Sequence, residues 1–583
     1  MRSLKVLFLA SAIAMIAYAC SKSFLDKAPL GQLDPSALAN KNGVNGILIG
    51  AYSLLDGYGG AGGDWSAAGS NWVYGSMAGT EAHKGSSVGD QPDAVPIETF
   101  RPTTTNYYFH NKWLLVYDGV SRCNDVIRTA ALATDLTQAE SDEILAEARG
   151  LRAWYHFEAK KMWNNIPFVD ETITYGAGNY FVPNTADAWP KIEEDLQYAI
   201  ANLPNSQAEV GRLNKYSAEA ILAKAYMFQH KYSDAKPLLD DIITSGKYQL
   251  VDQFHKNFDI INKNNTESIF AAQASVNDGA NGNNGNWGDV LNFPYGGSPG
   301  TCCGFFQPTQ YLVNHFKTDA VTGLPDLDNF SSSDVTNDMG KLSSDAFTPY
   351  AGTLDPRLDW TAGRRGIPYL DWGINVGNDW IRAQSDGGPY SPVKNVYPNA
   401  LLGKLTDASF WSSGVTANNI NLIRYADVLL WAAEVETEVP GGSLVTAENY
   451  VNMIRTRAAN PAGFVHTYID PSNPEGGFTN TPAANYKVSN YPAGFFSTQD
   501  IARKAIRYER MLELGMEGHR FFDLVRWGIA AQEINAYFPI EFASLKIAYI
   551  SGASFTANRN EYWPIPQNEI DKSNGTLVQN PGY

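Results

Sequence analysis

Aromatic residues alternate with polar side chains in an early stretch of the sequence, residues 56–108, which is rich in glycine and serine. The residues of interest there are Asp64-Trp65, Asn71-Trp72, Arg101 and Asn106-Tyr107-Tyr108. Flat rings stack on the apolar faces of sugars, while amide, carboxylate and guanidinium groups hydrogen-bond to pairs of hydroxyls. A connection this long is functional or disordered, and its tryptophans argue against disorder. The pattern therefore predicts a non-covalent binding surface for a hydroxyl-rich ligand.

Motifs for enzymatic chemistry are sparse. The sequence has no H-E-x-x-H and no phosphate-binding Walker loop, and its eight histidines are dispersed. Adjacent carboxylates such as Glu193-Glu194 lie in helical patterns, where charges usually mark a solvated face. A glycoside hydrolase needs two carboxylates that converge in a cleft, and a sequence does not display such convergence. We expect no enzymatic activity, and an exported hydrolase stays the alternative.

The four cysteines do not form a metal-binding pattern, because no second cluster of cysteine and histidine stands at ligand spacing. Cys20 ends the N-terminal leader, which leaves Cys123 and the adjacent Cys302 and Cys303. In an exported protein, a bridge from Cys123 to one of the pair is an open alternative. Asp326-x-Asp328-Asn329 lacks the glycine and the terminal glutamate of an EF-hand loop. We expect neither a metal nor a cofactor.

Residues 1–19 have the features of a secretory signal peptide. Two basic residues precede an apolar run that is too short to span a membrane. Either a lipoprotein peptidase cuts before Cys20, which then carries acyl chains, or Ala17-Tyr18-Ala19 is an ordinary cleavage site. The only early cysteine stands directly at the boundary, which favours lipidation of Cys20. Several acyl chains would anchor the remaining chain, residues 20–583, firmly to a membrane.

The net charge of −17 at pH 7 does not suit a polyanionic partner. Nucleic-acid binding is therefore not expected. The chain is 583 residues long and 44% hydrophobic, so it can bury a large core.

Helical patterns occupy most of the sequence. Residues 216–230 and 232–245 predict a close antiparallel pair, and residues 423–439 and 446–459 repeat the arrangement. Small residues where the helices touch, with aromatics between them, are typical of tetratricopeptide-like pairs.

A loop-rich excursion interrupts these pairs over about residues 271–417. Glycine, asparagine and proline accumulate there and helical periodicity disappears. We therefore expect one mainly α domain. Its helical scaffold covers about residues 36–270 and 418–583, and the large loop-rich insertion carries the ligand surface.

Residues 500–527 combine charges with large aromatics. Asp500 could cap a helix in which Glu509 and Glu513 share a face with nearby arginines. A second apolar run, laced with Arg520, Asp523 and Arg526, follows Gly518. Buried charges persist only when they are paired, so this stretch predicts a structural network of ion pairs rather than catalytic carboxylates.

Taken in order, many short motifs resemble the SusD/RagB family of surface lipoproteins over nearly all of the mature chain. They are Phe24-Leu25-Asp26 after Cys20, Trp113-x3-Tyr117, Glu147-Ala148-Arg149-x-Leu151-Arg152, Ile166-Pro167, Gly246-x-Tyr248-x-Leu250, Arg424-Tyr425-Ala426-Asp427, Asn452-x2-Arg455-x-Arg457, Glu509-Arg510, Trp563-Pro564-Ile565-Pro566 and the tail Asn580-Pro581-Gly582-Tyr583.

The resemblance implies a lipid-anchored protein of the outer membrane that faces the cell exterior. Such proteins cap a TonB-dependent, SusC-like transporter and bind nutrients, most often glycans and in some cases peptides. In the family, ligand contacts come from the early loop and from the central excursion, which adds Trp287 and Tyr295 as expected ligand-binding residues. Ser21-Lys22-Ser23 departs from the acidic run often found after the lipidated cysteine of surface-exported members. The resemblance therefore supports lipid anchoring more strongly than outward display.

Overall fold

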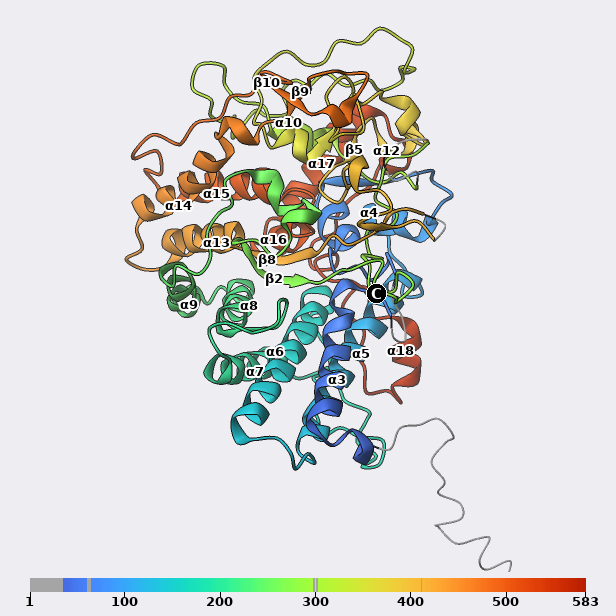
Figure 1. The fold of residues 1–583 in the computed structure, drawn as a ribbon, viewed down its shortest axis with the longest axis vertical. Helices are drawn as coiled ribbons and strands as arrows, with labels where there is room; N and C mark the ends of the chain where they lie inside the picture. Colours follow the sequence, from blue (N-terminus) through green and yellow to red (C-terminus); the bar gives the residue numbers. More distant parts are fainter. Residues whose placement is uncertain (1–34, 60–63, 297–298, 300–301, 410–411) are drawn as a thin grey trace, which may run out of the picture.

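The protein is described by a computed structural model that covers residues 35–59, 64–296, 299, 302–409 and 412–583. It is mostly helical (Figure 1). The longer helices are α3(Lys41–Tyr52), α5(Tyr107–Ala130), α6(Gln138–Trp163), α7(Trp189–Asn202), α8(Lys215–Phe228), α9(Tyr232–Thr244), α13(Tyr425–Glu438), α14(Leu444–Ala458), α15(Gln499–Leu514), α16(Arg520–Arg526) and α17(Ala530–Leu545). Residues 1–19, predicted as a signal peptide, and Cys20 lie outside the described residues.

Short elements fill the connections. The short α-helices are α4(Val95–Glu98), α10(Gln310–His315), α11(Leu358–Thr361), α12(Gln384–Gly387) and α18(Gln567–Lys572). The strands are β1(Ala82–Gly85), β2(Ser268–Ala272), β3(Phe305–Pro308), β4(Ala362–Gly363), β5(Ser391–Pro392), β6(Thr406–Asp407), β7(Val415–Thr416), β8(Ile420–Arg424), β9(His466–Tyr468) and β10(Phe478–Pro482). They form two-stranded antiparallel ribbons, β1–β3, β2–β8, β4–β5, β6–β7 and β9–β10.

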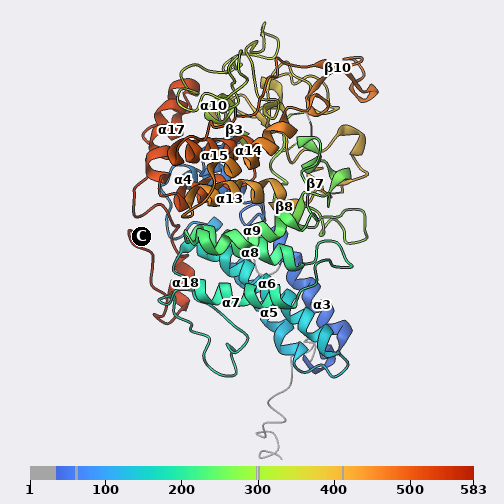
Figure 2. The same ribbon diagram turned by 90° about the vertical axis from the view of Figure 1, so that its left-hand side faces the viewer.

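Successive helices pack against one another and form a continuous stack. Helix α5 packs on α6, α6 on α7, α7 on α8, and α8 on α9. Helix α9 then packs against α13, which pairs with α14, so the early and late halves of the chain join directly (Figure 2). The predicted tetratricopeptide-like pairs are confirmed. No helix within the described ranges is long and apolar enough to cross a bilayer.

Local sequence explains where α6 begins and ends. The Thr137 side chain accepts a hydrogen bond from Glu140 N, and Glu140 accepts one from Thr137 N, so the Thr137-x-x-Glu140 sequence forms a capping box. After Trp163, Asn164 has a positive φ of 56° and its N–H bonds back to Lys160 O, which closes the last turn.

The early stretch 56–108, predicted as a loop, contains more regular structure than expected. A π-helical turn, η3(Trp72–Met77), and strand β1 lie within it. Helix α5 begins at Tyr107, inside this stretch, because the Asn106 side chain accepts a hydrogen bond from Tyr108 N and caps the helix. The prediction that Asn106 and Tyr107 belong to a loop is therefore wrong.

The central excursion leaves and rejoins the scaffold at one place. Strand β2 at its start pairs antiparallel with β8 at its end, in register from Ser268↔Arg424 to Ala272↔Ile420. Its interior is held by a small second core, separate from the main one, formed by Ile260, Phe293, Tyr369, Val393, Val396, Tyr397 and Ala417. Trp372 and Trp380 pack against this second core.

A buried network of ion pairs lies where α15 meets the scaffold, as predicted. Arg424 Nη1 lies 2.6 Å from Glu513 Oε1, and Arg357 Nη1 lies 2.7 Å from Glu509 Oε1. Helix α15 starts after Thr498, whose side chain accepts from Ile501 N, so Asp500 is not its cap. The structural interpretation of this stretch is confirmed by the complete burial of Glu509 and Glu513.

Candidate ligand-binding surface

Three residues predicted from the early stretch come together beside the start of α5. Asp64 and Trp65 are both half-buried, and the Asp64 carboxylate accepts a 2.6 Å hydrogen bond from Ser66 N. Trp65 lies beside Tyr107, which is half-buried too. Burial raises the pKa of Tyr107, while the side chains of Tyr108 and Trp65 oppose the rise. The phenol is therefore neutral at physiological pH and presents a ring with a polar tip.

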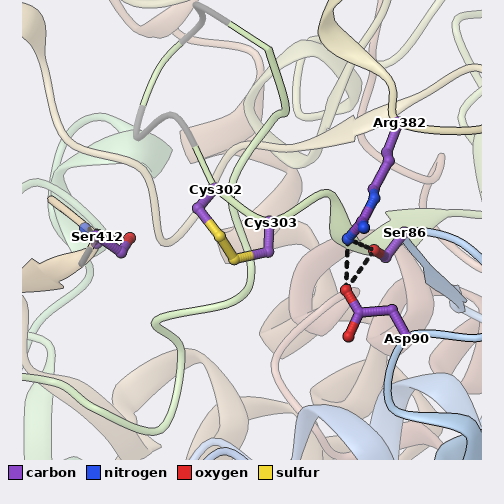
Figure 3. The surroundings of a disulfide bond; sticks show 7 residues. Ser86, Asp90, Cys302, Cys303, Arg382 and Ser412 are labelled. Carbon is purple, nitrogen blue, oxygen red and sulfur yellow. Dashed lines mark hydrogen bonds and ion pairs between the residues drawn. A yellow bond between two sulfur atoms is a disulfide. The ribbon is translucent and has the colours of Figure 1, made fainter.

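Loop 86–91 connects this group to residues of the excursion. The Tyr107 hydroxyl donates to Gln91 Oε1 at one end of the loop. Arg382 pairs with Asp90, the neighbour of Gln91, and donates to Ser86 Oγ at the other end of the loop at 2.9 Å (Figure 3). The Arg382 guanidinium also lies 5.2 Å from the centroid of the half-buried Tyr295 ring.

Trp287 lies under Tyr58, a residue that sequence reasoning missed. The two rings are stacked, with centroids 4.9 Å apart and an interplanar angle of 19°. Trp287 is 7% exposed and its Nε1 donates to Gly282 O at 3.0 Å, whereas Tyr58 is half-buried. Tyr58 therefore presents the outer ring of the pair. The position of this aromatic residue between Gly57 and Gly59 was the sequence signal that could have identified Tyr58 as a candidate.

We name these residues the loop surface: Tyr58, Asp64, Trp65, Asp90, Tyr107, Tyr295 and Arg382. They come from the early stretch, from loop 86–91 and from the excursion, and the helical scaffold holds all three. Half-buried rings beside a carboxylate and a guanidinium are suited to a ligand with apolar faces and hydroxyl edges.

Other predicted site residues belong to the framework behind the loop surface. Trp72 has no exposed area, and its Nε1 donates to Gly288 O at 3.2 Å. Asn71 is buried and its amide donates to Glu158 at 3.1 Å, while Asn106 caps α5. The side chain of Trp72 is enclosed because Phe305 and Phe306 pack around it. Trp72, Asn71 and Asn106 are therefore not among the proposed ligand contacts.

Arg101 lies exposed on a different part of the surface. Its guanidinium donates to Gly552 O, in the connection after α17. Trp372 and Trp380 are held within the excursion: Trp372 Nε1 donates to Tyr397 O at 2.7 Å, and the Trp380 ring lies edge-on to Tyr369.

Cys302 and Cys303 form a disulfide with each other, and Cys123 is buried outside any disulfide. The alternative in which Cys123 bridges to one of the pair is therefore wrong. The pair is placed by backbone hydrogen bonds from Cys303 N to Leu291 O at 3.2 Å and from Gly304 N to Phe293 O at 2.8 Å. This position brings the disulfide beside Ser86, Asp90 and Arg382 (Figure 3).

The acidic sequence around Asp326 has no metal-binding geometry in the described part of the chain. Asp326 accepts hydrogen bonds from the backbone N–H groups of Asp328 and Asn329, and Asp328 forms an ion pair with Lys504. Among the described residues, no three His, Cys, Asp or Glu side chains gather around a point that could hold a metal ion.

An apolar pocket of about 240 Å³ lies apart from the predicted residues. Its lining includes His255, Trp360, Val396 and Phe478, and the rings of His255 and Trp360 are stacked 4.2 Å apart. The residues of the loop surface do not line it.

A stack of helical pairs that carries a loop-rich insertion defines the class of protein, a mainly α-helical scaffold with aromatic residues in its loops. The family model described as the SusD family matches residues 266–583, and the one described as starch-binding associating with outer membrane matches residues 23–227. The chain therefore belongs to the SusD family.

Similar sequences and structures agree with this assignment. The SusD-like protein P2 of Formosa agariphila is 24% identical over 485 residues, which cover 81% of this chain and 80% of that protein. A solved laminarin-binding SusD-like protein has a TM-score of 0.64 at 22% identity and covers 93% of this chain and 100% of its own. The surface glycan-binding protein A of Bacteroides thetaiotaomicron, solved with laminarihexaose, has a TM-score of 0.63 at 22% identity, with 93% and 99% covered.

Proposed function

We propose that this protein binds an extracellular oligo- or polysaccharide on the loop surface and delivers it to a TonB-dependent, SusC-like transporter of the outer membrane. The observation that carries the proposal is the arrangement around loop 86–91, where Trp65, Tyr107 and Tyr295 gather beside the Asp90–Arg382 pair. Family membership and the glycans named for two structural neighbours support it.

Each part of the loop surface has a defined task in this proposal. The rings of Tyr58, Trp65 and Tyr295 pack against the C–H faces of sugar units, which are apolar although their edges are polar. Arg382 and Asp64 exchange hydrogen bonds with hydroxyl pairs. Binding changes no covalent bond, so we propose that the protein has no catalytic residues and needs neither metal nor cofactor.

Isothermal titration calorimetry with laminarihexaose, followed by a glycan array, tests this function. Trp65→Ala, Tyr58→Ala and Tyr295→Ala should each weaken affinity roughly three- to tenfold, since each removes one stacking partner. Tyr175→Ala is the matched control, because Tyr175 is an aromatic residue that is 85% exposed outside the loop surface. Trp72→Ala is unsuitable as a test, since removing a fully buried tryptophan destabilises the fold.

The titration also decides between ligand classes. Unchanged affinity in all three variants would place the site elsewhere. Heat with oligopeptides and none with any glycan would favour the peptide-binding alternative. Shortened products after incubation with a bound glycan would favour the hydrolase.

A further inference from the structure

The disulfide between Cys302 and Cys303 lies at the loop surface itself. Cys303 is 6% exposed and belongs to the main core, whereas Cys302 is half-buried and only packs against that core. Cys303 therefore anchors the pair in the main core, and Cys302 is its more exposed member. A disulfide in this position is not needed to join distant segments, because it links neighbours in the chain.

Polar groups of the loop surface stand next to this disulfide. Gly304 follows the pair directly, and a Cβ built on it would lie 3.3 Å from Arg382 Cβ and 3.4 Å from Tyr295 Cβ. Gly304 O also accepts a hydrogen bond of 2.5 Å from Ser86 N, so loop 86–91 is fastened to the same segment. Figure 3 shows the disulfide between Ser412 and the group formed by Arg382, Ser86 and Asp90.

The chemistry of the pair complements that of its neighbours. Sulfur is soft and polarizable, and in proteins it packs as an apolar atom against flat surfaces. Arg382, Asp90 and Ser86 provide donors and acceptors beside it. An apolar floor with polar groups at one edge matches a sugar ring, which has an apolar C–H face and hydroxyl groups around its rim.

We propose that the Cys302–Cys303 disulfide is a ligand-contacting element of this site: its sulfur atoms pack against the C–H face of a sugar unit next to the one on Tyr295, while Arg382 binds that unit's hydroxyls. This inference rests on the proposed glycan-binding function and adds a subsite to it. The oxidised pair is the binding form, since the bond holds both sulfur atoms together in one apolar patch.

Calorimetry with laminarihexaose tests the proposal on protein produced from residue 21 onward. The oxidised wild type is compared with the same protein reduced by a phosphine, and with a Cys302→Ala/Cys303→Ala double variant. Reduction and the double variant should each weaken affinity roughly two- to tenfold, the range expected for lost sulfur contacts. The double variant should show no further change on reduction.

Two controls distinguish a lost contact between the disulfide and the glycan from an effect on Cys123 or on folding. Cys123→Ala removes the buried thiol, and this variant should respond to reduction as the wild type does. Thermal unfolding shows whether the double variant is folded, and reduction of the wild type gives the same comparison without any substitution. Alkylation after denaturation should modify one cysteine in the oxidised protein and three in the reduced protein.

The outcomes distinguish this proposal from the function on which it rests. Equal affinities of the oxidised, reduced and double-variant proteins would overturn the subsite and leave glycan binding intact. Three alkylated cysteines in the untreated protein would overturn it as well. A wild type that binds no glycan would overturn both.

Discussion

His83 is enclosed by two carboxylates in the core. Its Nδ1 lies 2.9 Å from Glu98 Oε1 and its Nε2 lies 3.0 Å from Glu541 Oε1, with no exposed area on His83. Burial alone would lower its pKa, but hydrogen bonds and charges from Glu541 and Glu98 outweigh burial and raise the pKa to about 9. His83 is therefore an imidazolium at neutral pH that donates from both nitrogens.

This raised pKa makes stability depend on pH. The folded-state pKa of about 9 exceeds the ordinary 6.5, so the stabilisation is complete below pH 6.5 and is lost as pH rises through 9. In His83→Gln, thermal unfolding should lose this dependence between pH 6.5 and 9, where the wild type loses on the order of 3 kcal/mol. His230→Gln, at an exposed histidine, is the control. Parallel pH profiles of wild type and His83→Gln would contradict the assignment.

Residue exposure marks the limit of what the sequence could predict for the site. Asp64-Trp65 and Asn71-Trp72 have the same pattern, but of the two tryptophans only Trp65 is partly exposed. Trp72 is covered by Phe305, Phe306 and Gly288, which come from the distant excursion. Local patterns contain no information about such contacts, and Arg382 was missed for the same reason, whereas the place of Tyr58 between two glycines was a local signal.

At the scale of elements, α15 is fixed by its charges rather than by an apolar stripe alone. Glu513 has no exposed area and faces Arg357, Arg424 and Arg457. Burial opposes its ionisation, yet the three guanidinium groups hold the pKa of Glu513 below its ordinary value. The ion pairs join α15 to β8, α14 and the segment before α11.

Removing one member of this network should be costly. Glu513→Ala leaves three guanidinium groups buried without their shared carboxylate, and we expect a loss of about 3–5 kcal/mol in the free energy of unfolding. Glu209→Ala breaks an ion pair with Arg212 in which the Glu209 carboxylate is 67% exposed. This variant should lose less than about 1 kcal/mol in the free energy of unfolding. Denaturant unfolding of both variants measures the difference. A Glu513→Ala loss no larger than that of Glu209→Ala would show that the network contributes little.

Long helices were predictable because each carries its own periodicity and caps. The pairs α8–α9 and α13–α14 and the Thr137 capping box required no tertiary information. The start of α5 at Tyr107 and the π-helical turn η3 were missed, because their sequences are aromatic and glycine-rich and resemble a loop. The second core around Phe293 and Tyr397 brings together residues about a hundred positions apart.

At the scale of the whole molecule, the proposed attachment to a membrane rests on the N-terminus. The described chain contains no helix able to span a bilayer, and the proposed anchor, Cys20, precedes its first element, η1(Pro35–Leu38). In Figure 1, α3 and α5–α7 lie at the end of the molecule where the described chain begins. An anchor at Cys20 would therefore join the membrane to this helical end.

Replacing the proposed anchor should release the protein. In the full-length precursor, Cys20→Ala should abolish incorporation of labelled fatty acid and move the protein from the membrane fraction to the soluble fraction, because acyl chains supply the membrane affinity. Cys123→Ala should leave both readouts unchanged. Membrane association of Cys20→Ala without label would favour the ordinary cleavage site and another mode of attachment.

The pairing of β2 with β8 has a consequence for how this protein could diversify. The two strands hold the ends of the excursion side by side, while the β1–β3 ribbon, the packing of Phe305 and Phe306 on Trp72 and the Arg357–Glu509 ion pair fasten its interior to the scaffold. Lengthening a loop costs little once its ends are held together. Related sequences can thus differ in the length of the loops between β2 and β8, outside these fastening contacts, while the helical scaffold stays the same.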